Sequence, residues 1–185
     1  MASTASAEPI GAAPALRRLY VIRFVFAAAW AALLLLSGSE LTAEAKVLLF
    51  LYPAFDVAAA VVDARSAHAA GPVKGLYANM AASVLAAIGV AVASTSGVAD
   101  VLRVWGAWAV VSGLIQLLVG VARRPMGGQW AMILSGGISV LAGATFIRSA
   151  AQDNPSLTTL AGYATLGGIF FLVSAIRLSR STPRH

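Results

Sequence analysis

The chain has no cysteine and only two histidines among its 185 residues. Without cysteine it can form no disulfide bond, no thiolate metal site and no cysteine nucleophile. His68 lies in a polar connection and His185 is the last residue, so a histidine-rich metal site is excluded as well. The sequence also lacks phosphate-binding glycine loops, serine-hydrolase elbows and metal-binding histidine spacings. We therefore expect no enzyme, no metal and no cofactor.

Charged residues are scarce too, at 11% of the chain, whereas ordinary globular proteins carry about 25%. Hydrophobic residues account for 59%, and the mean hydropathy is +0.84. Six apolar runs approach the roughly 20 residues with which a helix crosses a bilayer. They cover residues 19–37, 44–63, 75–95, 101–122, 129–148 and 157–177. The sequence therefore predicts an all-α integral membrane protein with six transmembrane helices.

The net charge of +6 is unevenly distributed along the chain. Three basic residues lie near the connections after the first, third and fifth runs, at Lys46, Arg103 and Arg148. Nine lie near the opposite ends of the runs, at Arg17, Arg18, Arg65, Lys74, Arg123, Arg124, Arg177, Arg180 and Arg184. The positive-inside rule then predicts that both termini are cytoplasmic. The excess of basic residues therefore indicates how the chain is oriented in a lipid bilayer. It does not indicate nucleic-acid binding.

The two ends of the chain are polar. Residues 1–16 are small, polar and proline-containing, which predicts a disordered cytoplasmic tail, and residues 179–185 form a short basic cytoplasmic tail. A cleaved signal peptide over residues 17–40 is a less favoured alternative. Its apolar run is too long, and its removal would reverse the charge bias of the remaining runs.

A repeat of about 55 residues runs through the chain. In the fourth run small residues recur every seven positions, at Gly106, Gly113 and Gly120. Fifty-five residues further on, small residues again stand seven apart, at Ala161, Gly168 and Ala175. We predict three tandem helical hairpins, over residues 17–72, 73–126 and 127–178. Because each hairpin contains two spans, these are parallel repeats of one orientation.

Small residues at regular spacing allow two helix backbones to approach closely in a membrane. The fifth run adds such residues at intervals of four, at Ser135, Ser139 and Gly143. We predict that these three, together with Gly106, Gly113, Gly120 and Gly168, pack helices against one another.

Three segments carry a resemblance to a known family. WGAWAVVSGLIQLLVGVARR, GGQWAMILSGGISVLAGATFI and LTTLAGYATLGGIFFLVSAIRL resemble the HdeD-like family of small bacterial membrane proteins. The match is good over residues 98–178 and weaker over residues 19–97. It implies a six-helix protein of the bacterial inner membrane, built from paired-helix repeats and linked to acid or envelope stress. It supplies no catalytic residues.

Two opposite charges lie inside apolar runs, Arg23 in the first and Asp56 in the second. A charge at the centre of a membrane helix costs about 2.5–3.5 kcal/mol on the insertion scale, so such residues usually pair. A hairpin folded between Ser39 and Glu40 brings the two charges to equal depth. We predict that Arg23 and Asp56 face each other within the bilayer.

Two further residues share the helical face of Asp56. Tyr52 stands one turn before it, within reach of a hydrogen bond, and Asp63 follows two turns later toward the cytoplasmic boundary. One interpretation is a proton-sensitive or ion-relaying site with Arg23 as the counter-charge. The other is a structural ion pair that fixes the hairpin register, and the sequence alone favours this structural role.

A second polar pair is predicted in the middle hairpin. A turn near Gly97–Val98 places Asn79 and Gln116 at equal depth, and amides inside spans often bond across helices. Helix association is the favoured role over contact with a substrate. Three tryptophans fall near span ends and are expected in the interfacial aromatic belts, at Trp105, Trp108 and Trp130.

Three functions remain open at this point. The first is a non-enzymatic HdeD-like protein of stress tolerance or envelope homeostasis, handling protons or ions at Arg23 and Asp56. The second is an accessory or scaffold subunit whose glycine-rich faces bind partner membrane proteins or further copies of the chain. The third is a transporter of small solutes or lipids, although the sequence lacks paired broken helices.

Overall fold

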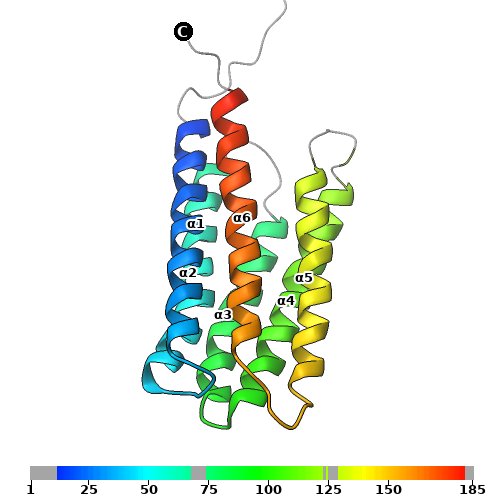
Figure 1. Cartoon of the computed structure of the whole chain (residues 1–185). Helices are drawn as coiled ribbons and strands as arrows, with labels where there is room; N and C mark the ends of the chain where they lie inside the picture. The colour runs from blue at the N-terminus through cyan, green and yellow to red at the C-terminus, as the bar shows by residue number, and fades with distance from the viewer. Residues whose placement is uncertain (1–11, 68–73, 123, 125–128, 182–185) are drawn as a thin grey trace, which may run out of the picture.

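A computed structural model describes residues 12–67, 74–122, 124 and 129–181 (Figure 1). Within these residues it contains six α-helices and no strand. Each helix is long and apolar enough to cross a membrane, as the sequence predicts. In chain order the helices are α1 (Ala12–Leu36), α2 (Ala43–Ala67), α3 (Lys74–Ala93), α4 (Val98–Ala122), α5 (Trp130–Ser149) and α6 (Thr158–Ser181).

The first and last helices extend beyond their apolar runs. α1 begins at Ala12, so residues 12–16 are helical where we expected a disordered tail. Pro14 lies in the first turn, where a helix requires no backbone N–H. α6 continues to Ser181, into the basic segment expected to be a tail. Apolarity sets the length of a span, but a helix continues until a residue breaks it.

The six helices form a closed ring in chain order, called the helix ring below. Each packs against its neighbours in the chain, and α6 returns to pack against α1. The most extensive contacts are those of α4 with α5 and of α1 with α6. Both join different predicted hairpins, whereas α5 and α6, which belong to one hairpin, touch least. The division into three repeats stays a prediction.

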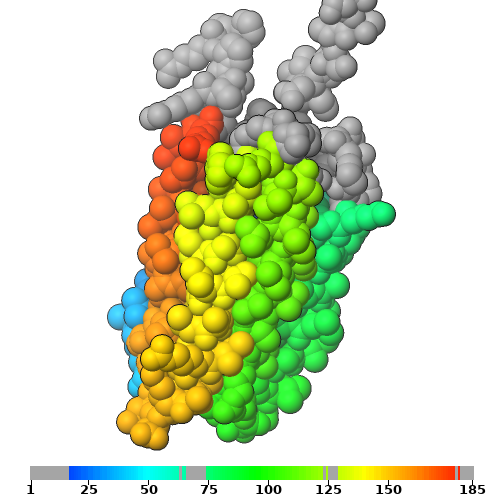
Figure 2. All heavy atoms as spheres, turned by 90° about the vertical axis from the view of Figure 1, so that its right-hand side faces the viewer, coloured from blue at the N-terminus to red at the C-terminus, as the bar shows by residue number. Residues whose placement is uncertain are grey.

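Small residues bring α4 and α5 together, side by side in Figure 2. A Cβ atom added at Gly106 would lie 2.7 Å from the carbonyl oxygen of Gly143, and one at Gly113 equally close to that of Gly136. A third at Gly120 would lie 2.9 Å from the side chain of Ile133. Since the obstacles at the first two sites are backbone atoms, glycine is what allows this close approach.

The outer surface of the helix ring is apolar. Long aliphatic side chains are exposed on several helices, at Leu36, Leu85, Leu118 and Leu141. Exposed apolar surface of this kind marks contact with an apolar environment. For six helices that are long and apolar enough to cross a membrane, that environment is the hydrocarbon of a bilayer.

Two tryptophans point inward instead of lying in an aromatic belt. Trp105 is fully buried and its ring stacks on Trp30 at 5.4 Å between centroids. Trp108 contacts Trp105 edge to face, at 5.1 Å. The belt prediction is therefore wrong for Trp105 and Trp108, whereas Trp130 is 64% exposed. Position along a span indicates depth, but only packing determines which way a side chain faces.

Candidate functional site

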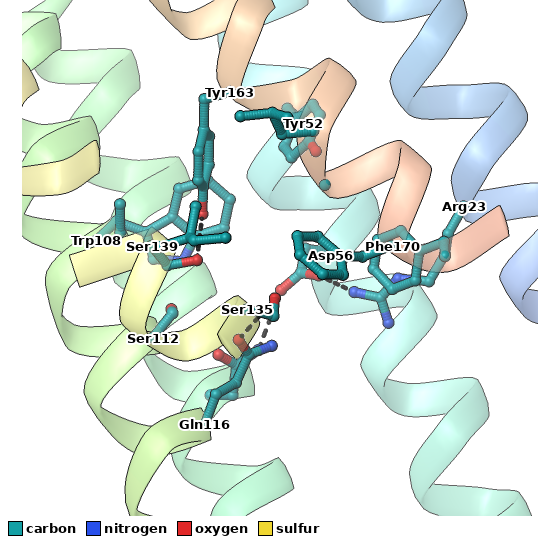
Figure 3. Close-up of a pocket in the computed structure, with 16 residues that line it drawn as sticks. Arg23, Tyr52, Asp56, Trp108, Ser112, Gln116, Ser135, Ser139, Tyr163 and Phe170 are labelled. Carbon is teal, nitrogen blue, oxygen red and sulfur yellow. Dashed lines mark hydrogen bonds and ion pairs between the residues drawn. The ribbon is translucent and has the colours of Figure 1, made fainter. Parts of the chain in front are cut away.

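A cavity of about 140 Å³ lies within the helix ring, and all six helices contribute residues to its wall (Figure 3). An engineered protein cavity of about 150 Å³ binds benzene. By that comparison this cavity has room for a ligand of about six non-hydrogen atoms. Its wall combines charged, amide and hydroxyl groups with aromatic and aliphatic side chains, so both polar and apolar contacts are available to a ligand.

Arg23 and Asp56 form an ion pair in the cavity wall. The guanidinium Nη2 donates to the carboxylate Oδ1, and the two side chains are only 14% and 15% exposed. The guanidinium group lies over the ring of Phe171 on α6, with Cζ 4.5 Å from the ring centroid. A cation is attracted to an aromatic face at this distance. The pair thus connects α1 with both α2 and α6.

Asp56 is the centre of a hydrogen-bond network that reaches α3 and α4. Its second oxygen, Oδ2, accepts bonds from the Asn79 side-chain amide at 3.2 Å and from the Ser83 hydroxyl at 2.8 Å. The Ser83 hydroxyl in turn accepts a bond from the indole N–H of Trp108 at 3.1 Å. Arg23 on α1, with Asn79 and Ser83 on α3, therefore supplies three donors to the ionised carboxylate, which lowers the cost of burying it.

Two other residues are predicted on the helical face of Asp56, namely Tyr52 and Asp63, and their surroundings differ. Tyr52 lines the cavity, and its ring packs against Trp30 and Trp105 at centroid distances of 4.7 and 5.4 Å. In the described part of the chain no hydrogen bond joins Tyr52 to Asp56. Asp63 lies in α2, but its side chain is outside the described residues.

Asn79 and Gln116 both reach the cavity, but each bonds to another partner in the described structure. Asn79 donates to Asp56, and Gln116 accepts a long bond of 3.5 Å from Ser135. The predicted amide–amide bond is not the one formed. An ionised carboxylate is the stronger acceptor, so it takes the amide hydrogen of Asn79.

Several residues of the cavity wall were missed by sequence reasoning. Tyr163 donates to Ser139 at 3.0 Å, joining α6 to α5. The hydroxyl of Ser112 is buried and has no hydrogen-bond partner among the described residues. Buried polar groups are nearly always hydrogen-bonded, so the unpaired hydroxyl of Ser112 marks a place where a ligand or water can bond.

The cavity wall follows the spacing of the predicted repeat. At intervals of 56 residues, α1, α3 and α5 contribute Arg23, Asn79 and Ser135. With intervals of 56 and then 55, α2, α4 and α6 contribute Asp56, Ser112 and Gly167, and one turn earlier Tyr52, Trp108 and Tyr163. The repeat spacing, applied to the two charged residues, is the sequence signal that could have located this wall.

The chain matches no protein-family model, no curated protein and no solved structure. Among the described residues, no cluster of three metal-ligating side chains occurs. The cavity wall can hold a proton on a carboxylate, present a guanidinium to an anion, and offer hydroxyl and amide groups to a polar ligand.

Proposed function

We propose that the chain is a non-enzymatic, HdeD-like protein of the bacterial inner membrane that handles protons or small ions at Arg23 and Asp56. In the cell it would serve stress tolerance, including acid stress, or envelope homeostasis. The observation that carries this proposal is the position of the ion pair in the wall of a cavity. A pair that only fixes helix register needs no open space beside it, whereas a pair that exchanges a proton or a ligand does.

The partners of Asp56 also support an exchange function. Asn79 and Ser83 bond to Oδ2, while Arg23 bonds to Oδ1. If Oδ1 takes up a proton, the two neutral donors still hold the carboxyl group in place. A proton can therefore bind and leave without displacing the side chain or collapsing the cavity.

The spacing of the cavity wall supports the repeat on which the family resemblance is based. Equivalent positions of the three predicted hairpins line one cavity, as expected of parallel units arranged around a common centre. The charged pair belongs to the first hairpin, and its equivalents in the other two are neutral. We therefore propose that the first hairpin carries the specialised site and that the other two complete the wall.

The scaffold alternative receives less support. The glycine faces of α4 that it would use are already filled by α5. A partner protein could bind these faces only by displacing α5. That displacement would break the most extensive contact between helices of the helix ring.

Proton flux in proteoliposomes tests the proposed function. The internal pH is followed after a pH jump in a buffer that contains chloride and lactate, with valinomycin and potassium holding the membrane potential at zero. We expect flux above that of protein-free liposomes for the wild type and background flux for Asp56→Asn. Asp100→Asn is the matched control, because Asp100 pairs with Arg103 at the exposed start of α4. Background flux in both the wild type and Asp56→Asn would contradict the proposal.

A further inference from the structure

We propose that the cavity binds a small monocarboxylate together with one proton, with the carboxylate on Arg23 and the proton on Asp56. This inference rests on the proposed function and names the ligand class of the same site. It follows from three properties of the cavity, namely its charge balance, the bonding of the two Asp56 oxygens, and the size and composition of its wall.

The charge balance requires proton and anion to bind together. Arg23 and Asp56 are the charged residues of the cavity wall, and they cancel. The other titratable groups on the wall are Tyr52 on α2 and Tyr163 on α6, which are neutral at physiological pH, while α3, α4 and α5 present amides, hydroxyls and an indole. Binding of an anion alone would give the cavity one net negative charge, and binding of a proton alone would give it one net positive charge. Since uncompensated charge within a membrane protein is costly, joint binding is the favoured change.

The two oxygens of Asp56 allow this exchange without rearrangement of the backbone. A proton from solution adds to Oδ1, which then releases the Arg23 Nη2 donor. Oδ2 keeps its bonds from Asn79 and Ser83. The freed guanidinium stays positioned over Phe171 and can bind the ligand carboxylate through two parallel N–H groups. No covalent bond other than O–H forms or breaks, and the net charge of the cavity stays zero.

The wall favours a small organic acid over other anions. A carboxylate matches the planar fork of a guanidinium, whereas a halide does not. A dicarboxylate would bring a second negative charge with no cation in the cavity wall to compensate it. Ile138, Leu166 and Phe170 offer apolar contact to a short carbon chain, and the unpaired Ser112 hydroxyl offers a further hydrogen bond. The volume of about 140 Å³ limits the ligand to about six non-hydrogen atoms.

Equilibrium binding of radiolabelled lactate to the full-length protein in detergent tests the inference. Lactate serves as a probe because it has a single carboxylate and six non-hydrogen atoms. We expect uptake of one proton per lactate, detected with a pH indicator in weakly buffered solution. Because one proton binds with each lactate, the affinity should fall as the pH rises, approaching about tenfold per pH unit by proton linkage. Lactamide, which is neutral, should not compete, and chloride should compete weakly.

Three variants separate the roles of the two charges. Asp56→Asn resembles the protonated carboxyl group, so it should bind lactate at every pH without taking up a proton. Arg23→Gln should weaken binding by about 30-fold or more, because it removes the charged partner of the carboxylate. Asp100→Asn should behave as the wild type. If either cavity variant fails to fold, the pH dependence and the proton count of the wild type decide the question alone.

Two outcomes would overturn the inference. The first is wild-type lactate affinity that does not change with pH, and the second is lactate uptake without a proton. If either result is obtained and Asp56→Asn still abolishes proton flux, the proposed function is retained and the monocarboxylate proposal is rejected. Absence of both proton flux and lactate binding removes both proposals.

Discussion

The indole of Trp108 on α4 donates a hydrogen bond to the hydroxyl of Ser83 on α3, 3.1 Å away. The same hydroxyl bonds to Asp56 on α2, so one small side chain connects a tryptophan to the charged centre of the cavity. Ser83 is fully buried. The position of Asp56 in the cavity therefore depends on a residue that carries no charge.

Replacing Ser83 should destabilise the protein more than the loss of one hydroxyl suggests. Ser83→Ala leaves the Trp108 N–H unpaired and removes one donor from Asp56, at a cost of about 1–3 kcal/mol. Thermal unfolding in detergent, followed by circular dichroism, measures the change. Thr145→Ala is the matched control, since Thr145 is exposed and bonds only within its own helix. Equal unfolding temperatures for both variants would contradict the network.

The ion pair should show strong coupling between its two members. Asp56→Ala leaves Arg23 largely buried without its anion and should destabilise the protein by about 3–5 kcal/mol. Replacing both residues, by Arg23→Met and Asp56→Leu, should recover most of that loss, because no unpaired charge remains. Denaturant unfolding of the two single variants and the double variant gives the coupling energy. Additive effects would show that the two charges do not depend on each other.

The α4–α5 interface should not tolerate even a methyl group. Gly113→Ala would place its Cβ atom 2.7 Å from the carbonyl oxygen of Gly136, and overpacking of this kind costs about 1–3 kcal/mol. Gly137→Ala is the control, because a Cβ atom at Gly137 meets nothing within 4 Å. Thermal unfolding of both variants tests the interface. We expect a lower unfolding temperature for Gly113→Ala and an unchanged or higher one for Gly137→Ala.

Ser112 should show opposite effects on stability and on ligand binding. Its hydroxyl is buried and has no hydrogen-bond partner among the described residues. Because no hydrogen bond offsets the desolvation of this hydroxyl, Ser112→Ala should stabilise the ligand-free protein by about 1 kcal/mol. The same change should weaken lactate binding, because the ligand loses a hydrogen bond. Unfolding and binding measured on one preparation test both effects. Destabilisation of the ligand-free protein would show that the hydroxyl has a structural partner.

Parts of this site follow from local sequence properties. The depth of Arg23 and Asp56 can be read from their distances to one hairpin turn, because each helical residue advances by a fixed rise. The small residues of α4 are recognisable from their seven-residue spacing. Ser83 and Ser112 give no such signal, since a lone serine in an apolar helix is common, and the repeat spacing relates only Ser112 to a charged residue, Asp56.

Other features could not be predicted because they depend on how the helices are rotated and paired. An apolar transmembrane helix is hydrophobic on every side, so periodicity does not separate its lipid-facing from its inward-facing residues. The position of Trp105 along its span therefore predicts an interfacial belt, although the residue lies in the core. For the same reason the sequence predicts a pair of Asn79 with Gln116, although Asp56 is the stronger acceptor within reach of Asn79.

The sequence by itself determined six apolar helices, and the spacing of Arg23 and Asp56 about one connection predicted that they meet. These properties depend on hydrophobic length, charge and spacing, which act locally and are imposed by a bilayer. Only the tertiary structure decided that α6 closes the ring against α1, that Ser83 and Asn79 bond to Asp56, and that a cavity remains beside the ion pair. Those features arise from close packing between helices, in which each contact depends on the orientation of all six.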